Sequence, residues 1–210
     1  QLRGSLSTPI NNSQEPTVLT RMAPVAMVSW TPFPLAHDIA ALTHNHPQAC
    51  LAAGATATLL QKLLVGESLQ DAVEAAWRKT EQAGGRGIAE AMEQALQAAD
   101  DGEPTIARCL EILGEPTATS ALALAVFATA STSDPMGAMT AVVQTGGPAS
   151  RLGALTGQIS GALHGPALPD ALVDALEARR AVITVAEDLY RHFSGVPFAL
   201  SEDEWDRYPG

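Results

Sequence analysis

Three glycines, Gly153, Gly157 and Gly161, recur every four residues in the stretch QTGGPASRLGALTGQISGALHG. Residues four apart lie on the same face of an α-helix, so these glycines would form a face without side chains. Each glycine costs a helix about 1 kcal/mol relative to alanine, and close approach of a second helix is the usual reason to keep one. The spacing therefore predicts tightly packed helices, with the apolar segment Ala118 to Ser131 as the expected partner.

The composition also favours helices. Of the 210 residues, 46% are hydrophobic and only 4% aromatic, and alanine and leucine dominate the apolar set. We expect an all-α, compact multi-helix protein with one domain over residues 1–210. Residues 1–35 are expected to be mostly loop, and residues 200–210 an acidic surface tail. The expected helices cover residues 34–44, 47–64, 69–83, 88–100, 105–113, 117–131, 134–145, 151–164 and 169–193.

The charge balance limits the partners. The formal net charge is -11, which opposes non-specific binding to nucleic acid or to an anionic membrane surface. The longest apolar run, ALALAVFATA, is shorter than the roughly 20 residues that a spanning helix needs. Cys50 and Cys109 lie in apolar helical patterns and are expected to be reduced core residues, which favours a cytoplasmic location.

The turn before the glycine face has the features of an anion site. Gly146 and Gly147 permit positive φ, and Ser150 is expected to cap the free N–H groups of the next helix. A helix N-terminus attracts anions, and Arg151 would add a positive charge. The alternative is a capped helix that follows an ordinary turn, and the residues alone leave both interpretations open.

Two histidines in the motif THNHP form a second candidate. The side chains of His44 and His46 could converge in a loop and supply acid–base chemistry. In the alternative, Thr43 and Asn45 cap or bridge the helix break, and His44 is a hydrogen-bonded polar group. Either way, the loop contains the only candidates for catalytic residues.

Four segments together resemble the ADP-ribosylglycohydrolase family, of the dinitrogenase-reductase-activating glycohydrolase type. They are PINNSQEPTVLTRMAPVAM, ALTHNHPQACLAAGATATLLQKLLVGESLQDAV, TATSALALAVFATASTSDPMGAMTAVVQTGG and LGALTGQISGALHGPALPDALVDAL. The resemblance implies an all-α fold that hydrolyses the glycosidic bond between ADP-ribose and a side chain or small acceptor, using two Mg²⁺ ions. It also implies that Thr43 and His44 lie at the rim of the substrate site.

The chain departs from the family at the metal ligands. The family's early TDDT segment would lie before Gln1, so we expect an N-terminally truncated family domain. In the late GGDTDT loop, Pro148, Ala149, Ser150 and Arg151 stand where the family has Asp, Thr, Asp and Thr. Carboxylate oxygens are the ligands that Mg²⁺ prefers, so we expect no metal cofactor.

Three functions are compatible with these features. The first is a family member without Mg²⁺-dependent hydrolase activity that acts as a binding or scaffold protein, as a homodimer or with a partner protein covering the truncated face. The second is a metal-independent enzyme that uses the old ADP-ribose site. The third is a residual hydrolase completed by another chain. In the first two, the candidate ligand is a nucleotide or small anion, bound through Thr43, His44, the glycine pair at 146 and 147, and the Ser150–Arg151 turn.

Overall fold

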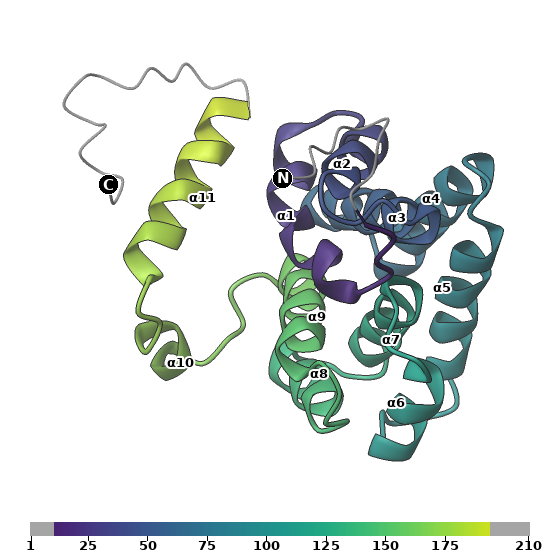
Figure 1. Ribbon diagram of the computed structural model, residues 1–210. Coiled ribbons are helices and arrows are strands. Elements are labelled where there is room, and N and C mark those ends of the chain that lie inside the picture. Colours follow the sequence, from purple (N-terminus) through teal and green to yellow (C-terminus); the bar gives the residue numbers. More distant parts are fainter. Residues whose placement is uncertain (1–10, 194–210) are drawn as a thin grey trace. The chain divides into compact units, whose positions relative to one another are not determined.

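The computed structural model describes residues 11–193, and every regular element within that range is a helix (Figure 1). The all-α prediction is therefore confirmed. The described residues fall into two compact units that divide between Ala167 and Leu168. One domain over residues 1–210 stays a prediction. No helix among the described residues is long and apolar enough to cross a bilayer.

The first unit contains a 3-10 helix, η1, and nine α-helices, and the second unit contains two further helices within the described range. Their bounds are η1 (Pro16–Arg21), α1 (Met22–Val28), α2 (Pro32–Ala41), α3 (Pro47–Leu64), α4 (Leu69–Gln82), α5 (Arg86–Ala99), α6 (Ile106–Leu113), α7 (Ala118–Ala130), α8 (Pro135–Val143), α9 (Ala149–His164), α10 (Asp170–Asp174) and α11 (Arg179–Phe193).

The N-terminal region is more ordered than expected. The prediction that residues 1–35 are mostly loop does not hold for residues 16–28 and 32–35, which are helical. Pro16 and Pro32 start their helices at positions where a missing N–H is harmless. Leu19 and Met22 are fully buried, so residues 16–28 are anchored in the core. The acidic tail expected at residues 200–210 lies outside the described residues.

Side-chain caps define several helix starts. Ser68, Thr105 and Asp134 each accept a hydrogen bond from a backbone N–H three residues later. Thr117 does the same for α7, and the Ser120 hydroxyl accepts in return from the Thr117 N–H, which makes a capping box. These caps explain why the helix starts could be predicted closely from the sequence.

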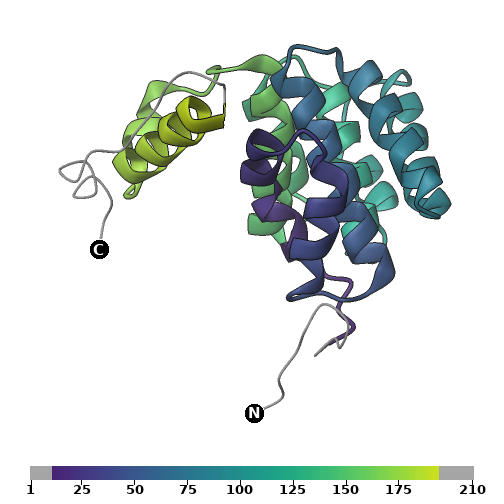
Figure 2. The same ribbon diagram turned by 90° about the horizontal axis from the view of Figure 1, so that it is seen from above.

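Two alanine-rich helices, α3 and α7, form the centre of the first unit. Nearly all of α7 is buried, as is α3 from Ala49 to Leu60 apart from Leu51. In the view from above, α7 lies between α9 and the α4–α5 pair, and α7 packs against both α5 and α9 (Figure 2). Because alanine has a short side chain, the helix backbones can approach closely, which explains the low aromatic content.

The glycine face of α9 packs on a different helix from the one expected. A Cβ added at Gly153 would lie 3.1 Å from Val143 Cγ2, and one at Gly157 would lie 3.0 Å from Met139 Sδ. Both contacts belong to α8, so the prediction that α7 is the partner is wrong. The short connection between α8 and α9 brings these consecutive helices together. At Gly161 a Cβ would meet nothing within 4 Å, so this glycine has no packing role.

The long helix expected over residues 169–193 is two helices. α10 ends at Asp174 and α11 begins at Arg179. The Arg179 guanidinium lies 3.2 Å from the Asp174 carboxylate and pairs the two sides of the break.

Candidate functional site

The turn that leads into α9 differs from its expected geometry. Gly146 has a φ of 74°, as expected, whereas Gly147 does not have positive φ. The N-cap is Pro148 and makes no side-chain cap, so the prediction of Ser150 as the cap is wrong. The Pro148 carbonyl instead accepts from the Arg151 and Leu152 N–H groups, which places Ser150 inside the first helical turn.

Arg151 brings this turn to the segment before η1. Its Nη1 atom lies 3.2 Å from Glu15 Oε2, and both side chains are about half exposed. The charges of Arg151 and Glu15 both act on the His44 imidazole. Arg151 and His44, two of the predicted ligand residues, are therefore brought together by the fold. Among the described residues, His44 makes no hydrogen bond with Gly146, Gly147 or Ser150.

A second guanidinium lies on the other side of the histidine loop. Arg21 Nη2 donates to Thr43 Oγ1, and Asn11 Nδ2 donates to the Thr43 carbonyl. Thr43 Oγ1 lies 2.9 Å from His44 Nδ1. We call Arg21, Thr43, His44 and Arg151, with the counter-ion Glu15, the two-arginine cluster.

The cluster keeps His44 neutral. Burial lowers the pKa of the His44 imidazole, and the charges of Arg21 and Arg151 lower it further against the opposing charge of Glu15. Because Thr43 Oγ1 accepts from Arg21, its own hydrogen can be donated to His44 Nδ1. That bond leaves the imidazole proton on Nε2, where it can be donated to a ligand.

His46 has a different role. Its Nδ1 atom accepts from the Gln48 N–H at 3.2 Å, which makes His46 the N-cap of α3. Structurally it takes the capping role expected of Thr43 or Asn45. Among the described residues no contact joins His46 to His44, so the two candidate catalytic histidines do not form a pair.

Gln158 in α9 positions Arg21. Its Oε1 atom accepts from the Ala23 N–H at 3.2 Å, and its Nε2 atom donates to the Thr20 carbonyl at 2.8 Å. These bonds hold the junction of η1 and α1 on both sides of Arg21. The segment that precedes Glu15 is tied down by the Gln14 carbonyl, which accepts from the α7 N-terminus.

The sequence analysis missed Asn11, Glu15, Arg21 and Gln158 as members or supports of the site. The first three lie in the segment that carries the family resemblance, which is the signal that could have found them. Gln158 gives a weaker signal, as a single amide in a helix of small and apolar residues.

The family model described as ADP-ribosylglycohydrolase matches residues 3–197. The chain belongs to this family. No curated protein gives a significant match.

A solved structure described as an "ADP-ribosylglycohydrolase-related protein complex" is similar to the chain, with 26% sequence identity and a TM-score of 0.68. The similarity covers 85% of this chain and 60% of that one. The chain thus spans about three fifths of the length of this relative.

The cluster does not suit the Mg²⁺ ions that the family resemblance implies. No three Asp, Glu, His or Cys side chains within residues 11–193 are grouped so that they could hold a metal ion. The one carboxylate of the cluster, Glu15, is paired with Arg151. A fixed guanidinium charge opposes a divalent cation, so the chemistry of these donors favours an anion.

Proposed function

We propose that this family member binds a phosphate-bearing ligand of the ADP-ribose type through the two-arginine cluster, without Mg²⁺ and without hydrolysing it. The observation that carries the proposal is the placement of Arg21 and Arg151 around a neutral His44. Two guanidinium groups and a neutral imidazole in one cluster offer donors of the kind that bind the oxygens of a diphosphate.

The existing contacts can be exchanged for a ligand at low cost. The Arg151–Glu15 pair is exposed, and exposed pairs are worth about 0–1 kcal/mol. A phosphate oxygen can therefore take the place of the Glu15 carboxylate on Arg151. Arg21 uses Nη2 on Thr43, which leaves its other N–H groups to donate.

Hydrolysis would need a group that activates water. The cluster offers one carboxylate, and that carboxylate serves as a counter-ion for Arg151. In the tautomer in which Thr43 donates to His44 Nδ1, that nitrogen is occupied and cannot act as a base. These observations support a binding protein derived from a hydrolase.

The test is a calorimetric titration of ADP-ribose into the chain, with EDTA and separately with Mg²⁺. Binding should be equal in the two buffers, and Arg21→Ala or Arg151→Ala should weaken it about tenfold or more. Arg86→Ala is the matched control, because Arg86 is also an exposed arginine paired with a glutamate. Mg²⁺-dependent binding, or equal losses in all three variants, would overturn the proposal.

A metal-independent enzyme is the second candidate, because the Thr43 hydroxyl also lies 3.5 Å from the Ala40 carbonyl. If the hydroxyl donates there, His44 Nδ1 donates to Thr43, and the Nε2 atom of the neutral imidazole is free to act as a general base. It predicts slow release of ADP-ribose from an ADP-ribosyl-arginine substrate in EDTA. That activity should be lost in His44→Gln but retained in His46→Gln. If no release occurs over days, the binding proposal is favoured.

We also propose that the chain works as a homodimer or with a partner protein. Exposed apolar side chains support this, above all Trp30, which is 91% exposed. Sedimentation at micromolar concentration should give a dimer. A monodisperse monomer that captures no partner from its own cell extract would contradict the proposal. A cytoplasmic location stays a prediction.

A further inference from the structure

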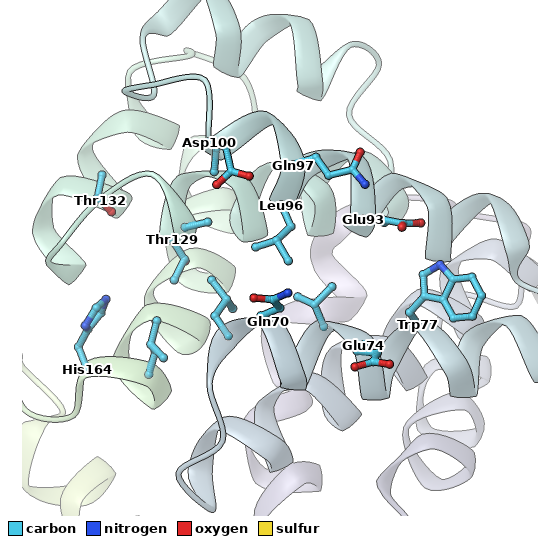
Figure 3. Close-up of a pocket in the computed structure, with 15 residues that line it drawn as sticks. Gln70, Glu74, Trp77, Glu93, Leu96, Gln97, Asp100, Thr129, Thr132 and His164 are labelled. Carbon is cyan, nitrogen blue, oxygen red and sulfur yellow. The ribbon is translucent and has the colours of Figure 1, made fainter.

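A cavity of about 740 Å³ lies among the α4–α5 pair and the C-terminal ends of α7 and α9 (Figure 3). This volume is in the range of small-molecule sites. His164 lines the cavity from the C-terminal end of α9, whereas Arg151 lies in the first turn of the same helix. At a rise of 1.5 Å per residue the two positions are about 20 Å apart, so the cavity is separate from the two-arginine cluster.

The cavity is lined by both acidic and apolar side chains. Glu74, Glu93 and Asp100 line it, and no lysine or arginine does so among the residues that the structure describes. Glu74 is already paired with Arg78, which lies outside the lining, so a ligand would have to compete with that exposed pair. The floor includes Leu69, Val73, Leu96 and Leu163. The cavity therefore repels anions such as ADP-ribose and suits a cation that has an apolar body.

Three residues of the wall have a buried polar atom without a hydrogen-bond partner among the described residues: Trp77 Nε1, Thr129 Oγ1 and His164 Nε2. The side chain of Thr129 is only 2% exposed, and its Oγ1 atom has no hydrogen-bond partner within the described part of the chain. The Nε2 atom of His164 is likewise buried without a partner there. A buried polar atom without a partner costs about 1–3 kcal/mol, so such atoms normally have one. A donor in the cavity could satisfy Thr129 or His164 once that side chain turns towards it, whereas Trp77 Nε1 is itself a donor and needs an acceptor such as a water.

These acceptors follow one another along the cavity. Glu74 and Glu93 lie towards Trp77 at one end, and His164 lies at the other, with Asp100 and Thr129 between them (Figure 3). From Glu93 to Asp100 the helix α5 advances about 10 Å. The arrangement suits an elongated molecule with several donors separated by apolar links.

We propose that this cavity binds an alkyl polyamine. The ammonium groups would meet the carboxylates, and the next donor along the chain would meet Thr129 and His164. The alkylene links would lie on the leucine and valine side chains of the floor. Trp77 closes one end with an aromatic ring, a group that attracts cations.

The test is calorimetric titration of spermidine into the full chain at constant ionic strength, without ADP-ribose. One spermidine should bind per chain, and the neutral analogue 1,8-octanediol should not bind. Asp100→Asn should weaken spermidine binding about fivefold or more, because it removes one carboxylate of the wall. Asp101→Asn is the matched control, since Asp101 is adjacent, carries the same charge and does not line the cavity.

A second variant separates a ligand site from a structural water site. Thr129→Val keeps the shape of the side chain and removes the hydroxyl, so it should weaken spermidine binding while leaving the chain folded. Equal losses in Asp100→Asn and Asp101→Asn would mean that binding follows net charge alone, and would overturn the proposal. No measurable binding of spermidine would also overturn it. Neither result would affect the ADP-ribose proposal, which rests on other residues.

Discussion

The same substitution, glycine to alanine, should have opposite effects at two helical positions of the first unit. Gly54 in α3 and Gly161 in α9 both have negative φ, so alanine is allowed at both by the backbone. In both helices the change from glycine to alanine should by itself raise the free energy of unfolding by about 0.5–1 kcal/mol. The change in stability that is observed then depends on which atoms the added Cβ meets.

At Gly161 a Cβ meets nothing within 4 Å, so Gly161→Ala should raise the free energy of unfolding by the helix term, about 0.5–1 kcal/mol. At Gly54 a Cβ would lie 2.9 Å from three ring atoms of Phe33, closer than carbon atoms approach without displacement. The aromatic ring is rigid, and overpacking of this kind costs about 1–3 kcal/mol. Gly54→Ala should therefore be about 1–3 kcal/mol less stable than Gly161→Ala.

Urea unfolding followed by circular dichroism measures both values, with the slope m checked for constancy. Phe33→Leu supplies the internal control: if the ring is the obstacle, Gly54→Ala should cost less in the Phe33→Leu background than in the original chain. Equal stabilities of Gly54→Ala and Gly161→Ala would refute the contact between the Phe33 ring of α2 and Gly54 of α3.

The free energy of unfolding should depend on pH through His44, because the pKa of its imidazole is lower in the folded chain than in the unfolded chain. As the pH drops below about 6.5, the unfolded chain binds the proton more readily, so stability falls. His44→Asn should remove that fall in urea titrations at a series of pH values. Gln158→Leu loses two hydrogen bonds to the backbone around Arg21, so it should cost about 1–2 kcal/mol in urea and also weaken ADP-ribose binding in calorimetry. Cys50 and Cys109 are buried with raised pKa values, so iodoacetamide at pH 7 should label them much more slowly in the folded chain than in urea, as read by mass spectrometry.

Helix positions followed from the sequence because their signals are local. Pro47 and Gly66 bracket α3, and the predicted range of residues 47–64 coincides with the helix observed. Ser68 marks the start of α4 in the same way. Caps, prolines and glycines act within a few residues, so each can be interpreted without knowing what the helix packs against.

Helix partners and site supports could not be predicted in this way. The glycine face indicated a close neighbour but did not say which helix it was, and α8 rather than α7 occupies that place. Gln158 contacts Ala23 across 135 positions of sequence, and no periodicity reports such a contact. Arg21 becomes a site residue only because the fold brings η1 beside the histidine loop. Long-range placement, not local conformation, was the missing information.

The geometry of α9 explains how the helix can combine tight packing with altered chemistry. Arg151 and Gln158 are seven residues apart and therefore lie within about 20° of each other around the helix axis. Gly153 lies roughly on the opposite side and Gly157 about 100–120° away around the axis, and both face α8. One face is thus constrained by close contact between backbones, while the other presents a guanidinium and a positioning amide to the N-terminal segment. Because Arg151 contacts Glu15 while Gly153 and Gly157 face α8, the residue at position 151 can change without disturbing that packing. Under the proposed function, a change from a cation site to an anion site at this turn would therefore require no change of fold.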